Sequence, residues 1–462
     1  MNLTPAEIAA ALGAEVLAEG APEPPRRATI SSGDAGPGDL FFGLRGANRD
    51  GGEFAAAAIA AGAWGAVVGS AWRSYFLPDG GGNYDRGRAE EGGAWVFVVD
   101  DPLAAMQSLA RGHRRSLGAR VVGVTGSVGK TSVKDIARAL LPGKVHASPE
   151  NWNTEIGLPL TVLEAPDDAG MLVLEMAMRG RGQIAELAAI AEPEVAVITN
   201  VGPVHVELLG SVEAIAAAKA EVLDSLSPGG TAVAPAEAGE LEPHLERAPN
   251  LLRFGTGGDV EATEVKVADG VTEASISTPL GAQRFHFPFT EAHNLTNALA
   301  AIAAGVALGA DLAEMADRAA DIGFSRFRGE RLELPGGIVL VNDCYNANPV
   351  SMRAALDHLA SLDAERTVAV LGEMGELGPD SAAYHREVGE HARASGIDFV
   401  IGVGAPARDY DPDELVADPG EAAELLAARL QPGDAVLVKG SRSAGLEAVA
   451  EQLPELVEAG DG

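Results

Sequence analysis

Cysteine is almost absent from this chain, and basic residues are scarce. Cys344 is the only cysteine among 462 residues, so an intrachain disulfide is impossible and zinc sites built on four cysteines are excluded. Lysine and arginine together number 34 against 67 acidic residues, which gives a net charge of −33. We do not expect so acidic a chain to bind nucleic acid or an anionic membrane surface, because phosphate groups would repel it.

Long apolar runs and internal repeats are missing as well. No apolar run is long enough to cross a membrane, and the N-terminal sequence MNLTPAEIAAALGAEV lacks the basic segment and apolar core of a signal peptide. The 57 glycines and 27 prolines follow no fixed period. The composition, 47% hydrophobic and 22% charged, is that of a globular protein. We therefore expect a cytoplasmic protein that does not insert into membranes and is monomeric.

The scarcity of lysine makes each lysine informative. Six occur, at positions 130, 134, 144, 219, 266 and 439, against 28 arginines. On an acidic chain, a phosphate or carboxylate substrate must be attracted by a few local basic groups, by helix N-termini or by metal ions. Basic residues in loops are therefore candidates for the functional site.

The order of apolar and polar segments predicts an α/β protein of about three domains. At roughly 150 residues per domain, a chain of this length corresponds to about three units. Residues 1–115 mix short helices and strands, residues 116–325 alternate strand and helix patterns, and the alternation restarts over 326–462. Such alternation indicates a parallel sheet covered by helices. We place the domain boundaries at these positions.

Individual elements can be predicted within these units. In the central unit, apolar strands are expected at 171–175 and 195–199, and an antiparallel patch with a period of two over 259–288. The Gly-rich, polar segment 78–93 is expected to be an exposed loop. In the last unit we expect strands at 338–342, 367–371, 398–403 and 435–438 and helices at 350–360 and 381–394.

The segment Thr125-Gly126-Ser127-Val128-Gly129-Lys130-Thr131 lies between a predicted strand and a predicted helix. Glycines let backbone N–H groups curl around phosphates, the lysine reaches the terminal phosphates, and the threonine hydroxyl can hold Mg²⁺. The strict pattern requires glycine at position 124, where this chain has Val124. The segment is therefore a variant phosphate-binding loop, and its strand-turn-helix context favours nucleotide binding.

Three residues of the central unit could act beside this loop. Glu175 ends an apolar strand, where it could hold Mg²⁺ or be a surface charge. His205 also follows a strand, and on its own is more typical of a hydrogen-bonding loop histidine. Lys219 lies in a helix of small apolar residues; it is either a solvated lysine or a partly buried one with altered protonation, and composition does not decide between these.

Polar clusters occur at three further positions. His293, Asn294 and Asn297 begin an Ala-rich helix over 294–308; Asn294 could cap it, or the asparagine pair, three residues apart, could contact an adenine edge. The segment 343–349, DCYNANP, follows a strand and could be either turn chemistry or part of a site. Another strand is followed by Lys439-Gly440-Ser441-Arg442-Ser443, a basic, hydroxyl-rich loop that favours anion binding.

In this order, these segments resemble the Mur ligases, the ATP-dependent amide ligases of cell-wall precursor synthesis. The resemblance covers nearly the whole chain: GPGDLFFGLRG, TGSVGKTSVK, NWNTEIGLPLT, HVELLGS, KAEVL, HNLTNALAA, DCYNANPVSMRAAL, LGEMGELG and VKGSRSAGLE. YNANP and GEMGELG are most similar to the members that add D-alanyl-D-alanine. The resemblance implies three domains, with a central parallel-sheet P-loop ATPase domain and a C-terminal Rossmann-like α/β domain.

The resemblance also implies what each domain binds. The first would hold the UDP-sugar, the second ATP with Mg²⁺, and the third would close over both. The implied substrates are UDP-N-acetylmuramoyl-tripeptide and D-alanyl-D-alanine, joined through an acyl phosphate. One departure concerns the first domain: where family members commonly carry Asp-Ser-Arg, this chain has Ser31-Ser32-Gly33, so the usual acidic and basic partners of the UDP end are missing.

Residue roles follow from the same resemblance. Lys130, Glu175, His205 and Lys219 form the implied catalytic set, with Mg²⁺ held by Thr131, Glu175, His205 and a carbamylated Lys219. Cofactor binding is implied for Thr125, Gly126, Ser127, Gly129, Lys130, Thr131, Ser132, His293, Asn294, Asn297, Arg328, Asp343 and Asn346. Contacts with the other substrates are implied for Ser32, Asn153, Thr154, Tyr345, Asn348, Lys439, Ser441 and Arg442.

Two alternatives remain open at this stage. The first is a related ligase with a different amino acceptor, against which the YNANP segment argues. The second is a P-loop kinase or ATPase that forms no amide; it would account for Lys130 and Thr131 but would leave the motifs of the last unit without a use.

Overall fold

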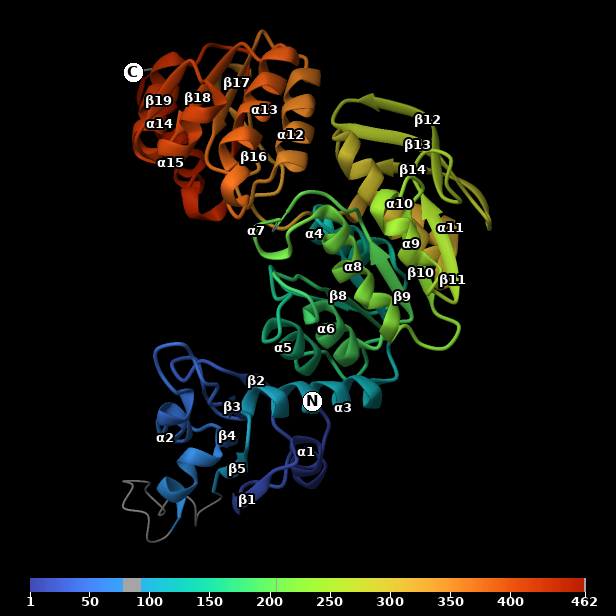
Figure 1. Ribbon diagram of the computed structural model, residues 1–462, viewed down its shortest axis with the longest axis vertical. Coiled ribbons are helices and arrows are strands. Elements are labelled where there is room, and N and C mark those ends of the chain that lie inside the picture. Colours follow the sequence, from blue (N-terminus) through green and yellow to red (C-terminus); the bar gives the residue numbers. More distant parts are fainter. Residues whose placement is uncertain (78–92, 205, 461–462) are drawn as a thin grey trace.

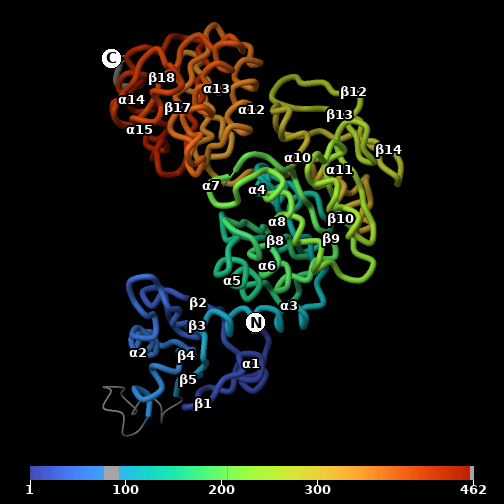
Figure 2. The backbone as a smooth tube through the Cα atoms, in the orientation of Figure 1, coloured from blue at the N-terminus to red at the C-terminus, as the bar shows by residue number. Residues whose placement is uncertain are grey.

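The computed structural model describes residues 1–77, 93–204 and 206–460 and forms three units along its long axis (Figure 1). The Gly-rich segment expected to be a loop falls almost entirely outside these ranges, and His205 falls outside them too. Figure 2 shows the chain passing from the first unit through the central unit to the third, where the C-terminus lies. The fold is α/β, as predicted. In the described ranges no helix is both long and apolar enough to span a membrane.

The first unit is built on a five-stranded sheet with the order β1-β5-β4-β3-β2. β2, β3, β4 and β5 run parallel, and β1 is antiparallel to β5. The elements are α1 (Pro5–Leu12), β1 (Glu15–Ala18), β2 (Arg27–Thr29), β3 (Asp39–Phe42), α2 (Ala55–Ala60), β4 (Gly65–Gly69), β5 (Trp95–Val99) and α3 (Pro102–Leu117).

Helix α3 connects the first unit with the central one (Figure 1). Asp101 caps its N-terminus by accepting from the Leu103 and Ala104 N–H groups, and Pro102 takes the first helical position, where no N–H is needed. Four of its buried residues, Ala105, Met106, Leu109 and Ala110, belong to a hydrophobic core that also contains side chains of α1 and of the central unit. The two units therefore share one core at this helix.

The central unit contains a six-stranded, fully parallel sheet with the order β11-β10-β9-β6-β8-β7. The strands are β6 (Arg120–Thr125), β7 (Val145–Ala147), β8 (Met171–Glu175), β9 (Val195–Ile198), β10 (Thr231–Pro235) and β11 (Asn250–Phe254). β8 and β9 confirm the predicted strands, and β10 and β11 extend the sheet beyond them.

Helices cover both faces of this sheet because its strands alternate between two cores. Leu172 and Leu174 of β8 face the core shared with α5 (Gly157–Leu163), α6 (Gln183–Ala191) and α8 (Val212–Lys219). Val173 faces the other core, formed with α4 (Lys130–Leu140) and α10 (Ala292–Ala307). Successive side chains of any strand point to opposite faces of the sheet. A strand with apolar residues on both faces is typical of a parallel sheet buried between helices.

The predicted antiparallel patch is confirmed as a three-stranded sheet packed on α10. Its strands are β12 (Glu261–Ala268), β13 (Val271–Thr278) and β14 (Gly281–Phe287). Phe285, Phe287 and Phe289 stack in a row with centroid distances of 5.5 and 5.2 Å. Shorter helices complete the unit: α7 (Val206–Leu209), α9 (Glu242–Leu245) and α11 (Leu312–Arg318).

The third unit is a six-stranded sheet with the order β15-β16-β20-β17-β18-β19, in which only β15 is antiparallel. The strands are β15 (Glu330–Leu334), β16 (Ile338–Asn342), β17 (Arg366–Leu371), β18 (Phe399–Val403), β19 (Glu414–Val416) and β20 (Asp434–Lys439). One face packs on α12 (Pro349–Ser361) and α13 (Ser381–Ala394), the other on α14 (Pro419–Arg429) and α15 (Glu447–Gly460). The carboxyl ends of β16, β20 and β17 lie side by side and carry the loops that face the central unit.

Candidate active site

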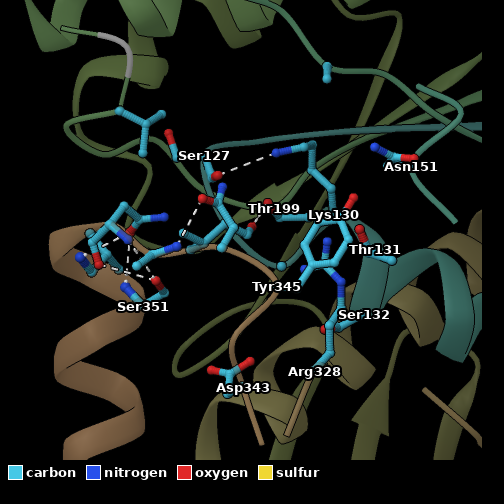
Figure 3. Close-up of a pocket in the computed structure, with 18 of the residues that line it drawn as sticks. Ser127, Lys130, Thr131, Ser132, Asn151, Thr199, Arg328, Asp343, Tyr345 and Ser351 are labelled. Carbon is cyan, nitrogen blue, oxygen red and sulfur yellow. Dashed lines mark hydrogen bonds between the residues drawn. The ribbon is translucent and has the colours of Figure 1, made fainter. Parts of the chain in front are cut away.

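A cavity of about 1260 Å³ lies between the central unit and the third unit. Figure 3 shows part of its wall, where Lys130, Thr131 and Ser132 of the central unit come together with Arg328, Asp343 and Tyr345 of the third unit. Most of the residues proposed from the sequence line it: Ser127, Gly129, Lys130, Thr131, Ser132, Asn153, Thr154, Glu175, His293, Asn294, Asn297, Arg328, Asp343, Tyr345, Asn346, Asn348, Lys439, Ser441 and Arg442.

A few of the proposed residues lie elsewhere. Thr125 and Gly126 lie just before the lining part of the phosphate loop, and Lys219 is buried near it without lining the cavity. Ser32 follows β2 in the first unit, outside the cavity. The position of His205 is not among the described residues.

The phosphate loop between β6 and α4 is shaped by two glycines. Gly126 has φ 148° and Gly129 has φ 80°, which are left-handed values that favour glycine. A Cβ on Gly126 would come within 1.9 Å of Thr199 Oγ1, and one on Gly129 within 2.4 Å of Asn297 Oδ1. Larger residues would therefore push apart the loop and its neighbours. The loop ends at the N-terminus of α4, where unpaired N–H groups favour an anion.

The Lys130 side chain curls back over this loop. Its Nζ donates to the carbonyl oxygens of Gly126 at 2.9 Å and Ser127 at 3.3 Å. Burial lowers the pKa of Lys130, nearby Glu175 opposes this shift, and Arg328 adds to it. The ammonium group is thus held beside the loop by carbonyl groups, and within the described part of the chain no carboxylate bonds it directly.

Glu175 stands at the carboxyl end of β8, 1% exposed, with both oxygens engaged. The Thr131 hydroxyl donates to its Oε2 at 2.8 Å, and Asn153 Nδ2 donates to its Oε1 at 2.7 Å. Three elements of the central unit therefore place a carboxylate, a hydroxyl and an amide in contact at the cavity wall. Carboxylate and hydroxyl oxygens are ligands that suit Mg²⁺.

Lys219 ends α8 and is 2% exposed. Burial, reinforced by repulsion from Lys130, holds the pKa of the Lys219 amine well below its usual range. No carboxylate among the described residues forms an ion pair with it. The environment therefore favours the neutral amine, or its conversion into a group of another charge. Of the two readings left open by composition, the solvated helix face is wrong.

The asparagine pair on α10 is linked to the third unit through Glu291. Asn297 Nδ2 donates to Asn294 Oδ1 at 3.3 Å, and Asn294 Nδ2 donates to Glu291 Oε2 at 3.4 Å. Glu291 Oε1 lies 3.6 Å from Nε2 of His358, which belongs to α12. Asn294 thus does not cap the helix with its side chain, and its amide group is fixed between two neighbours.

Arg328 and Tyr345 form the opposite wall. The Arg328 guanidinium carbon lies 4.0 Å from the centre of the Tyr345 ring, which is a cation–π contact. Arg328 Nε is buried without a hydrogen-bond partner in the described part of the protein. A buried donor without a partner costs free energy, so this arginine is placed to receive an acceptor from a ligand.

The segment after β16 is held by side chains of its own unit. Lys439 Nζ donates to Asp343 Oδ2 at 2.6 Å. Asn348 caps α12: its Oδ1 accepts from the N–H groups of Val350 and Ser351. Turn and cap chemistry, left open by the sequence, is therefore present here, on residues that also line the cavity.

Sequence reasoning missed several lining residues. Thr199 and Asn200 follow β9, and the Asn200 Oδ1 accepts from the Val128 N–H at 3.0 Å. Their signal was available, since polar residues directly after a buried strand are expected at the ligand edge of a parallel sheet. Glu291 and His358 gave no local signal, because only the packing of the third unit on α10 brings them together.

Comparison with known proteins places this geometry in a family. The Mur ligase middle domain matches residues 124–305, and the Mur ligase glutamate ligase domain matches residues 327–442. A UDP-N-acetylmuramoyl-tripeptide–D-alanyl-D-alanine ligase of Synechocystis is 38% identical over 90% of this chain and 89% of its own length. The ligase of that name from Escherichia coli K12 is 34% identical, covering 91% of each chain. The chain belongs to the MurF family of Mur ligases.

Solved MurF structures have the same fold. A MurF structure from Acinetobacter baumannii superposes with a TM-score of 0.85 and 27% identity, covering 98% of this chain and 99% of the other. MurF from Thermotoga maritima, solved in complex with ADP, gives a TM-score of 0.81 and 30% identity over 94% of this chain and 98% of the other. The three-unit arrangement seen here is thus that of MurF enzymes along the whole chain.

Proposed function

We infer that this protein is an ATP-dependent amide ligase that joins D-alanyl-D-alanine to the terminal carboxylate of UDP-N-acetylmuramoyl-tripeptide. The observation that carries this proposal is the cavity, in which the phosphate loop and Glu175 face Arg328, Asp343 and Tyr345 of the third unit. The curated relatives with this activity in their names match about nine tenths of the chain. The product would be a pentapeptide precursor of peptidoglycan, with ADP and phosphate released.

The proposed reaction has two steps, phosphoryl transfer and amide formation. A carboxylate oxygen of the tripeptide attacks the γ-phosphorus of ATP, ADP leaves, and an acyl phosphate forms. The neutral amine of D-alanyl-D-alanine then attacks the carbonyl carbon, phosphate leaves through a tetrahedral intermediate, and the nitrogen loses a proton. Both steps place negative charges close together, so alignment and charge neutralisation are the main demands on the protein.

The residues of the cavity meet these demands from two sides. The phosphate loop offers N–H groups and the α4 N-terminus to the phosphates, and Lys130 reaches them from its position over the loop. Arg328, with its unpartnered Nε, would hold a phosphate oxygen from the third unit. Closing the cavity around these groups protects an acyl phosphate from water. Ribose contact by Asp343 and adenine contact by Asn294 and Asn297 complete the proposed nucleotide site.

The residues present also fit Mg²⁺. Glu175 and Thr131 supply a carboxylate and a hydroxyl at one point. No group of three or more His, Cys, Asp or Glu side chains is placed to hold a metal within the described ranges. The pair formed by Glu175 and Thr131 suits Mg²⁺, because this ion is commonly held by one or two carboxylates together with substrate phosphates. Bound there, Mg²⁺ would neutralise the developing charge on the phosphates.

We further propose that Lys219 is carbamylated. A neutral amine attacks CO₂ through its nitrogen, forms an N–C bond and loses a proton, which gives a carbamate with carboxylate-like oxygens. The depressed pKa of the buried Lys219 favours the neutral amine that this step needs. The carbamate and His205 would then join Glu175 as the second metal site.

The remaining substrates are proposed to bind at the two ends of this site. The first domain, residues 1–115, would hold the UDP-sugar near Ser32, the central domain, 116–325, would hold ATP, and the third, 326–462, would close over both. Asn153 and Thr154 would meet the tripeptide from the central domain. Tyr345, Asn348, Lys439, Ser441 and Arg442 line the cavity from the third domain, and we propose that the dipeptide enters on this side.

A mass-resolved assay tests the proposed function. The protein is incubated with Mg²⁺-ATP, UDP-N-acetylmuramoyl-tripeptide and D-alanyl-D-alanine, and phosphate release and product mass are followed together. We expect a product heavier than the tripeptide by one dehydrated dipeptide, formed only when ATP is present. Phosphate release without that product, with every plausible amino acceptor, would instead favour an ATPase or kinase. A product formed only with another amine would favour a related ligase.

A further inference from the structure

Lys439, the last residue of β20, is a buried lysine whose hydrogen-bonding capacity is used up inside the protein. Its side chain is 2% exposed. Its Nζ donates to Asp343 Oδ2 at 2.6 Å, to the Asn346 carbonyl oxygen at 3.0 Å and to the Asp343 carbonyl oxygen at 3.3 Å. An ammonium group has three hydrogens and no acceptor, so these three bonds leave none for a substrate.

All three bonds end on the segment that follows β16. β20 lies between β16 and β17 in the sheet, so a side chain at the end of β20 can reach the loops on either side. Asp343 and Asn346 both line the cavity, and Figure 3 shows Asp343 on the wall below the phosphate loop. Lys439 therefore fixes the path of this loop and the direction of the Asp343 carboxylate.

Ser441, two residues further on, holds the other neighbouring loop. Its N–H donates to the Glu373 carbonyl oxygen at 2.9 Å, and its Oγ accepts from the Gly375 N–H at 2.8 Å. The segment after β20 thus braces the loops after β16 and β17 against each other. It is built as a support whose polar groups point to its neighbours, although its composition resembles that of an anion site.

We propose that Lys439 is a positioning residue that acts through Asp343 on the nucleotide, and is not a ligand of the incoming dipeptide. The inference rests on the proposed function, because it assumes that Asp343 faces ATP. Without Lys439 the Asp343 carboxylate loses its counter-charge and its fixed direction, and the loop after β16 loses two carbonyl anchors. The cost should appear in the use of ATP and should depend on Asp343 being an aspartate.

A double-mutant cycle tests this dependence. Lys439→Met, Asp343→Asn and the double variant are compared by kcat/KM for ATP with the other substrates saturating. We expect each single change to lower kcat/KM by about 10-fold or more, and the double variant to fall within about threefold of the worse single variant. Independent losses that multiply in the double variant would overturn the proposal.

A second cycle combines the Lys439→Met change with a change in the dipeptide substrate. D-Alanyl-D-alaninamide lacks the terminal carboxylate that a substrate-binding lysine would neutralise. We expect the amide to be disfavoured against D-alanyl-D-alanine by the same factor in the wild type and in Lys439→Met. If that factor disappears in Lys439→Met, Lys439 binds the carboxylate and the proposal is wrong.

Controls separate this outcome from unfolding and from failure of the proposed function. Thermal unfolding of each variant is followed, and if Lys439→Met does not fold, Lys439→Gln, which keeps two N–H donors, replaces it in both cycles. Lys144→Met removes an exposed lysine that pairs with Asp168, and we expect wild-type kinetics from it. Wild-type protein that forms no amide would contradict the proposed function, whereas an active wild type with additive losses would contradict only the inference.

Discussion

At the scale of single residues, the proposed ATP site depends on a few cations in an otherwise acidic molecule. Lys130 is one of six lysines in the chain and lies half-buried over the phosphate loop. Its Nζ is bonded there to carbonyl oxygens. Lys130 can therefore turn from these oxygens to a phosphate oxygen without breaking an ion pair. The rarity of lysine thus pointed to a residue that lines the cavity.

We predict that Lys130→Ala lowers turnover by about 10³-fold, because a charge that stabilises the transferring phosphoryl group is lost in a site with little water. The steady-state rate of phosphate release measures this. Lys134→Ala is no suitable control, since Lys134 is buried and bonds the Ser148 carbonyl oxygen. Lys144→Ala serves instead, and near-normal turnover of Lys130→Ala would remove the basis for the ATP site.

A second prediction concerns Lys219. We expect Lys219→Ala to be severely impaired, and to recover part of its turnover when acetate or formate is added, because a small carboxylate can fill the vacated volume and replace the carbamate. Chloride at the same ionic strength is the control. Unimpaired turnover, or equal effects of chloride and acetate, would show that no carboxylate-like group is needed at this position.

At the scale of elements, strand ends were the features best predicted from sequence. β8 and β16 begin and end at the predicted residues, because four or five apolar residues between turns leave little choice. β15, with the alternating sequence ERLEL, was not predicted, since a short half-exposed strand gives a weak signal until its partner is known. The helix that the sequence predicts around Lys219 ends at this residue and continues as a 3₁₀ helix over 220–225.

The same reasoning explains which site residues sequence could find. Glu175 and the phosphate loop directly follow buried strands, and position alone places them at the ligand edge of the sheet. His358 lies on a helix one unit away from Glu291, and only the docking of α12 near the start of α10 pairs them. The internal use of Lys439 was equally hidden, because its partner Asp343 is 96 residues distant.

Asn348 caps helix α12 and is also proposed to contact a substrate, and measurements of stability separate the first role from the second. Asn348→Ala should lower the free energy of unfolding by about 1 kcal/mol, because two N–H groups lose their acceptor, whereas Asn348→Asp should keep the cap. Chemical denaturation measures both. Asp418→Ala removes the equivalent cap from α14 and should cost a similar amount while leaving turnover unchanged. Equal stability of Asn348→Ala and the wild type would contradict the capping role.

At the scale of the whole molecule, charged side chains join neighbouring units. Helix α3 joins the first unit to the central one, and Arg111 and Arg115 on this helix both bond Glu192, which follows α6. Bonding by Arg115, with Arg111 adding to it, lowers the pKa of Glu192 to about 2 from an ordinary 4.5. The bonds to the two arginines therefore stabilise the folded state at every pH at which the Glu192 carboxylate is ionised.

This predicts a pH dependence with a definite sign. The folded-state pKa of Glu192 is lowered, so its contribution to stability is fully present above pH 4.5 and is lost as the pH falls through about 2. We expect Glu192→Gln to be less stable than the wild type at pH 7 and the difference to shrink over this window, as measured by denaturation at each pH. Glu240→Gln, at an exposed glutamate, is the control. A difference that persists unchanged at pH 2 would contradict this assignment.

The proposed function requires that the cavity couple ATP to amide formation through an acyl phosphate. It is tested most directly by labelling both oxygens of the tripeptide's terminal carboxylate with ¹⁸O and following the label during turnover with Mg²⁺-ATP and D-alanyl-D-alanine. We predict that one ¹⁸O leaves in the released phosphate and that the other remains in the new amide carbonyl. Release of unlabelled phosphate together with the amide product would contradict an acyl-phosphate intermediate.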